Sequence, residues 1–142
     1  MIVQDVLTPY EFSGAAYFLK GMVQHRVIQS DADGTFDFYW RIRPDDSSTG
    51  NIRSFRVGGF DAFPLDADWR IDGLGVEAPD TARHFGSGSV TFLFPNRPGE
   101  QSEDRSSRFF FLDTEATQYA MTGEYDLLCA NTRCNSPLFS TF

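Results

Sequence analysis

The chain has 142 residues, near the commonest size of a single domain, and its 15 Phe, 5 Tyr and 2 Trp can fill one substantial core, which argues against disorder. Its formal net charge of -8 would on average repel a phosphate backbone or an anionic membrane surface, and no stretch is as apolar as a membrane span of about 18 residues. We therefore expect one domain over residues 1–142, no nucleic-acid partner and no membrane span in this chain.

The first part of the chain has the period of a β-strand, because large apolar side chains recur at every second residue. Residues 2–7 alternate only weakly and are expected to form a short edge strand or a disordered lead, and residues 1–14 as a whole are expected to be peripheral. Residues 16–29 alternate more clearly, and residues 30–34 supply turn-forming side chains before the next strand, 35–42. These two segments are predicted to pair as a hairpin. Its second strand directs Phe36, Phe38, Trp40 and Ile42 to one face.

Turn-forming residues punctuate the rest of the chain, and no stretch longer than a turn or two has helical periodicity. Residues 64–88 are predicted to be irregular apart from a short segment at 69–71, and residues 135–142 are expected to be peripheral. The further predicted strands are 52–57, 89–94, 108–112 and 119–128. This pattern predicts an all-β fold, an antiparallel two-sheet β-sandwich that is Ig-like or jelly-roll-like, with a closed barrel as the alternative.

The two cysteines, Cys129 and Cys134, are close enough in sequence for a disulfide that would staple a short loop. Such a bond implies an oxidising compartment, whereas two free thiols are the alternative. A zinc site would need more ligands, and neither His25 nor His84 has a metal-ligand spacing from the pair.

The densest group of carboxylates contains Asp66, Asp68 and Asp72, followed by Glu77 and Asp80. Oxygen ligands at short spacing suit calcium, so the first three are candidate calcium ligands and calcium is the one cofactor we consider. The complete calcium-loop spacing is absent, and the alternative is a loop of solvated carboxylates. A pair of these acids could also act as the general acid and base of a glycosidase, but sequence does not determine their separation.

Aromatic side chains outside the main core phase are candidate ligand-binding residues. Tyr39 and Phe110 fall on the opposite face of their strands, and Trp69 borders the acidic segment. Their rings could stack on sugars or pack on a partner, and the alternative is burial against the second sheet or a crossing loop.

The two histidines receive different interpretations. His25 is in phase with the apolar residues of its strand, so we expect a core histidine satisfied by a hydrogen bond. His84 lies in a loop where it could act as an acid or base, although no nucleophile accompanies it.

Three segments in order carry a family resemblance: Phe36–Ile42 running through an Asp/Ser turn into Ile52–Phe55, then Trp69–Gly75, then Pro98–Glu100 leading to Ser106–Thr114. Together they resemble exported bacterial proteins of the PEP-CTERM class, whose mature part is often a single β-sandwich of unknown function. The resemblance implies export to a secreted or cell-surface location. It also implies a leader before the domain and a sorting tail after it; the sequence has neither, and we expect both processed ends to be missing and Met1 to be an added start.

The leading hypothesis is an exported non-enzymatic module with a structural or adhesive role in a bacterial envelope or extracellular matrix. Its expected partners are an extracellular polysaccharide or other copies of itself, with residues 2–7 or 138–142 adding to the edge of a neighbouring sheet. The alternatives are a calcium-dependent carbohydrate-binding module that uses Trp69, and a small hydrolase that uses Asp68 or His84.

Overall fold

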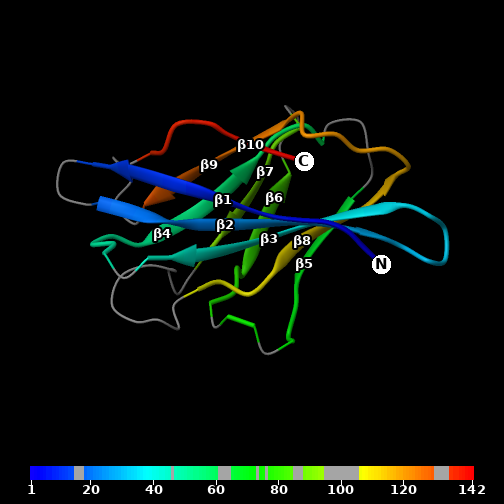
Figure 1. Cartoon of the computed structure of the whole chain (residues 1–142), viewed down its shortest axis with the longest axis horizontal. Helices are drawn as coiled ribbons and strands as arrows, with labels where there is room; N and C mark the ends of the chain where they lie inside the picture. Colours follow the sequence, from blue (N-terminus) through cyan, green and yellow to red (C-terminus); the bar gives the residue numbers. More distant parts are fainter. Residues whose placement is uncertain are drawn as a thin grey trace.

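The computed structural model of the chain describes residues 1–14, 18–45, 47–60, 65–72, 74–75, 77–84, 88–94, 106–129 and 135–142. Within these ranges no helix is long and apolar enough to cross a membrane. The described residues form ten strands in chain order (Figure 1): β1 Ile2–Ser13, β2 Phe18–Gln29, β3 Phe36–Pro44, β4 Ile52–Val57, β5 Leu65–Trp69, β6 Thr81–His84, β7 Val90–Leu93, β8 Phe110–Ala116, β9 Gly123–Cys129 and β10 Phe139–Thr141.

The strands form two five-stranded sheets that pack face to face. The first sheet has the order β1-β2-β3-β8-β5 and the second the order β10-β9-β4-β7-β6, and neighbouring strands are antiparallel throughout. The prediction of a two-sheet sandwich is therefore confirmed, and the alternative of a closed barrel is not. Sandwiches of this kind bury the inward-facing side chains of both sheets.

The predicted hairpin of β2 and β3 is confirmed, and its register runs from Gly21 opposite Pro44 to Gln29 opposite Phe36. The inward face of β3 carries Trp40, which is almost fully buried against rings of the other sheet. The centroid of Trp40 lies 5.5 Å from that of Phe55. Alternation along the strands thus builds the core, because every second side chain meets the opposite sheet.

One side of the sandwich is closed by the first and last strands. Residues 1–14 contribute β1, which pairs with β2 over most of its length, and Thr141 of β10 is fully buried. Thr141 Oγ1 accepts a hydrogen bond from Trp40 Nε1 at 2.9 Å and lies 2.9 Å from His25 Nδ1. His25 Nε2 lies 2.6 Å from Thr8 Oγ1, so the predicted core histidine with hydrogen-bonded ring nitrogens is confirmed.

Three sequence predictions about strands and faces are wrong. The segment 64–88, expected to be irregular, supplies β5 and β6, which are edge strands and therefore need only one partner each. The last long strand begins at Gly123 rather than at 119, because the chain turns at 121–122 and exposes Met121. Phe110, assigned by alternation to the outer face, lies on the inner face and is fully buried against Phe55 and Phe92 of the second sheet, which was the alternative to ligand binding.

Candidate functional site

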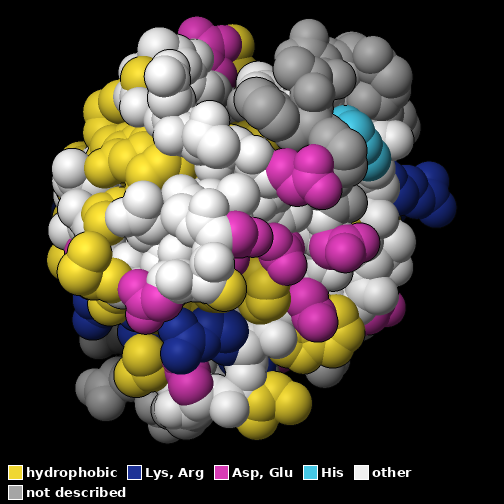
Figure 2. Space-filling model, turned by 90° about the vertical axis from the view of Figure 1, so that its right-hand side faces the viewer, with side chains coloured by type: hydrophobic (Ala, Val, Ile, Leu, Met, Phe, Trp, Pro, Cys, Tyr) yellow, Lys and Arg dark blue, Asp and Glu magenta, His cyan; other side chains and the backbone are white. Residues whose placement is uncertain are grey.

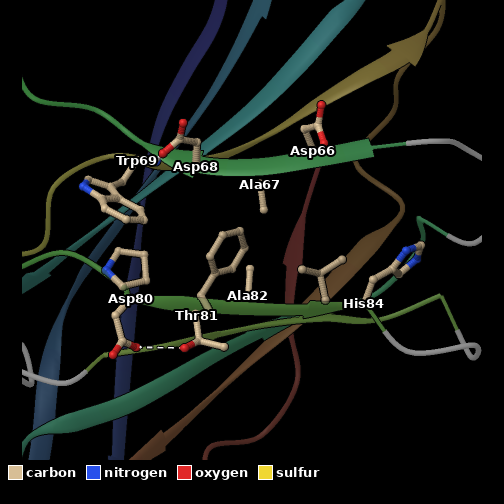
Figure 3. Close-up of a pocket in the computed structure, with 11 residues that line it drawn as sticks. Asp66, Ala67, Asp68, Trp69, Asp80, Thr81, Ala82 and His84 are labelled. Carbon is tan, nitrogen blue, oxygen red and sulfur yellow. Dashed lines mark hydrogen bonds between the residues drawn. The ribbon is translucent and has the colours of Figure 1, made fainter.

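The two sheets leave an open groove at the side opposite β1 and β10, where edge strand β5 of one sheet faces edge strand β6 of the other. The groove has a volume of about 310 Å³ and is shown in Figure 3. Its lining comes from β5, β6, β7 and the residues just before β6. The lining residues are Asp66, Ala67, Asp68, Trp69, Pro79, Asp80, Thr81, Ala82, His84, Val90 and Phe92.

The alternation of β5 decides which of its side chains enter the groove. Ala67 pairs with Leu112 and Trp69 with Phe110, so these two side chains share the inward face of the strand. In Figure 3 Ala67 and Trp69 point toward β6, and Ala82 of β6 points back toward them. Small side chains at both facing positions keep the groove open, while Trp69 remains 38% exposed at its end.

The polar groups lie at the rim of the groove rather than on its floor. Thr81 Oγ1 donates a hydrogen bond to Asp80 Oδ1 at 3.1 Å, and His84 is exposed at the other end of β6. The floor is apolar, because Val90 and Phe92 of β7 are buried beneath it. An apolar floor with an aromatic wall and polar rim is suited to a ligand that has both apolar and hydroxyl groups.

The candidate calcium ligands do not lie together. Asp66 and Asp68 point away from the groove on the outer face of β5, and Asp68 Oδ1 accepts a hydrogen bond from Trp69 N at 2.8 Å. Asp72 pairs with Arg70 Nε at 3.3 Å and accepts a hydrogen bond from Leu74 N at 3.1 Å. Within the part of the chain that the structure describes, no three His, Cys, Asp or Glu side chains form a group that could hold a metal ion. The calcium site stays a prediction from sequence.

Tyr39 lies on a different surface from Trp69, the outer face of the first sheet. Its ring stacks on that of Phe111, with centroids 4.5 Å apart and planes inclined by 21°, and the Arg70 guanidinium carbon lies 5.7 Å from its centroid. Burial raises the pKa of its hydroxyl. The two aromatic residues proposed from sequence therefore belong to opposite faces of the first sheet and cannot form one site.

A pair of carboxylates that sequence reasoning missed lies beside Tyr39. Asp37 of β3 and Asp113 of β8 share the outer face, and Asp37 Oδ1 accepts a hydrogen bond from Thr114 N at 3.1 Å. Burial, together with the nearby Asp113 and Asp33 carboxylates, raises the pKa of Asp37 to about 6 against the opposing effect of the Thr114 bond. Nothing in the local sequence brings β3 and β8 together, so only the strand order reveals this pair.

One half of the predicted disulfide, Cys134, lies outside the described residues. Cys129 is buried on β9.

No family model, curated protein or solved structure matches this chain.

Proposed function

We propose that this chain is an exported, non-enzymatic β-sandwich module that binds an extracellular polysaccharide and has an adhesive or structural role in a bacterial envelope or matrix. The observation that supports the proposal most directly is the orientation of Trp69, whose partly exposed ring forms one wall of the groove between β5 and β6. Export is inferred from the family resemblance of the sequence.

A sugar ring has an apolar face of C–H groups and an edge of hydroxyl groups. The Trp69 ring can cover the apolar face, because aromatic rings combine a large apolar surface with an electron-rich face. The hydroxyl edge would then lie near the rim, where Asp80 and Thr81 carry hydrogen-bonding oxygens and His84 a ring nitrogen.

The arrangement of acids favours binding over hydrolysis. A glycosidase needs two carboxyl groups on opposite sides of the bond that it cleaves. Asp66 and Asp68 of β5 are directed away from the groove, and Asp80 is bonded to Thr81 at its rim. The two carboxylates that β5 contributes therefore do not face Asp80 across the groove.

The test is a glycan array followed by calorimetric titration of the best polysaccharide hit, using Trp69→Ala. The exposed 38% of a Trp side chain is roughly 90 Å². Covering that surface contributes about 2 kcal/mol, so the variant should bind roughly 30-fold more weakly.

Ile71→Ala is the matched control, because Ile71 is 82% exposed two residues further along the chain and does not line the groove. The control should bind like the unmodified chain. Binding that disappears with a calcium chelator would favour the calcium-dependent alternative. An array without any signal, or equal loss in both variants, would contradict the proposal.

A further inference from the structure

Three arginines lie together on the outer face of the second sheet, although the chain has a net charge of -8. Arg53 and Arg56 of β4 and Arg83 of β6, here called the arginine patch, line a shallow pocket of about 350 Å³ together with Thr91 of β7. Thr91 is paired with both Arg56 and Arg83 in the strand register. Arg56 and Arg83 are thus two strand spacings apart, about 10 Å.

The arginine patch retains positive charge. Arg56 Nε donates a hydrogen bond to Asp126 Oδ1 at 2.9 Å, and its Nη2 bonds the other oxygen of the same carboxylate. This paired contact holds the guanidinium in place, while the Arg56 side chain remains 45% exposed. The Arg53 and Arg83 side chains are exposed and make no ion pair or hydrogen bond with other described residues.

Three carboxylates form a matching row on the outer face of the first sheet. Asp37 of β3, Asp113 of β8 and Asp66 of β5, here called the acidic row, lie on three adjacent strands. Asp66 is directly opposite Asp113, and Asp113 adjoins Asp37. The outer two acids are therefore also about 10 Å apart.

The acidic row lies near the end of the molecule that is on the right of Figure 1, where β3 begins and β8 ends. Figure 2 views that end and shows acidic side chains gathered across its middle.

We propose that the arginine patch of one molecule binds the acidic row of a second copy of this chain. Arg56 and Arg83 would face the two outer carboxylates, and the Thr91 hydroxyl would donate to the central Asp113. The two surfaces carry opposite charges, and the outer charged residues of each are about 10 Å apart. A second copy of this chain therefore fits the arginine patch. Because the two surfaces differ, the contact is heterologous, and repetition gives an open chain of molecules rather than a closed dimer.

This inference also changes the mode of self-association expected from sequence. Residues 2–7 and 138–142, which were expected to add to a neighbouring sheet, belong to or adjoin the edge strands β1 and β10, and neither strand is part of the two charged surfaces. The groove at Trp69 is not part of either charged surface. Trp69→Ala should therefore associate like the unmodified chain, and failure of sugar binding would leave this inference intact.

The experiment is a charge exchange followed by sedimentation velocity over a range of concentrations at low salt. One variant combines Arg53→Glu with Arg83→Glu, and the other combines Asp66→Arg with Asp113→Arg. All four side chains are exposed, and the buried Asp126 keeps its partner Arg56. For each variant alone the association constant should fall by about tenfold or more, since the substitutions place like charges in contact. An equimolar mixture of the two should associate again, because each carries the surface that the other needs.

The matched control combines Lys20→Glu with Arg43→Glu, two exposed residues outside both surfaces that change the net charge as much as the arginine variant does. This control should associate more strongly than the arginine variant. Salt of about 1 M, at which the screening length is about 3 Å, should abolish association of the unmodified chain.

Circular dichroism would verify that every variant is folded. The inference is overturned if the unmodified chain is monomeric at all concentrations or if the mixture of variants stays monomeric. It is equally overturned if polygalacturonate binds the arginine patch of a chain that never self-associates.

Discussion

The carboxylate pair of Asp37 and Asp113 makes a quantitative prediction about stability. The pKa of Asp37 rises from an ordinary 3.8 to about 6 because the carboxyl group is partly buried and faces Asp113. A shift of about two pKa units corresponds to about 3 kcal/mol of unfolding free energy at neutral pH. The group is only partly buried, so solvent screening reduces the expected effect to about 1 kcal/mol. Asp37→Asn removes the charge and keeps an oxygen that can accept the Thr114 hydrogen bond, so it should stabilise the protein by that amount at pH 7.

The stability gained by Asp37→Asn should increase with pH. The folded state holds the Asp37 proton more tightly than the unfolded state, so the stability contributed by this group is complete below its unfolded pKa of 3.8 and is lost as pH rises through about 6. Asp37→Asn should therefore equal the unmodified chain near pH 4 and exceed it above pH 6. His25 acts oppositely, since burial lowers its pKa to about 4 and folding stability falls as pH drops from 6.5 to that value. Its contribution is common to both proteins and cancels in the difference.

Urea unfolding followed by circular dichroism at a series of pH values measures this difference. Asp31→Asn, which removes an exposed acid from the neighbouring hairpin turn, is the control and should change stability by less than about 0.5 kcal/mol at every pH. A loss of stability in Asp37→Asn at pH 7, or a gain of equal size at pH 4 and pH 7, would refute the electrostatic explanation.

Two further substitutions test the packing. Thr141→Val should lower the unfolding free energy by about 2–4 kcal/mol in urea titrations, because it removes the oxygen that bonds buried Trp40 Nε1 and His25 Nδ1. Thr122→Val, at an exposed position, should cost far less. Equal losses in the two variants would contradict the stabilising role of the Thr141 hydroxyl. Gly21→Ala should cost about 2 kcal/mol in thermal unfolding, since a Cβ there collides with the Arg43 carbonyl and the Tyr10 ring. A Cβ at Gly58 would lie 3.9 Å from its nearest atom, so Gly58→Ala should be well tolerated. Similar melting temperatures for the two variants would contradict the predicted collision at Gly21.

The sequence correctly predicted which side chains are buried where apolar and polar residues alternate within a single strand. The alternation of residues 35–42 placed Phe38, Trp40 and Ile42 correctly in the core, and the in-phase position of His25 correctly indicated a buried ring. Prediction failed where neighbouring residues are all apolar. In the run from Phe109 to Leu112 alternation cannot tell the two faces apart, and Phe110 was assigned to the wrong one.

Sequence predicted the residue types of the candidate site better than their grouping. Trp69, Asp80 and His84 were identified individually, and they line one groove because β5 and β6 are edge strands of different sheets. Asp66, Asp68 and Asp72 were grouped because they are close in sequence, but alternation and the Arg70 contact separate them from the groove.

By itself the sequence determined the hairpin of β2 and β3, the strands β4 and β7 and a core of aromatic side chains, because side-chain alternation is a local property of the backbone. Only the tertiary structure decided that β5 faces β6 across a groove, that Asp37 adjoins Asp113 and that Arg56 and Arg83 share a patch. These groupings depend on the order of strands in each sheet. That order is set by how the apolar faces of distant segments are buried together, which the period of a single strand does not encode.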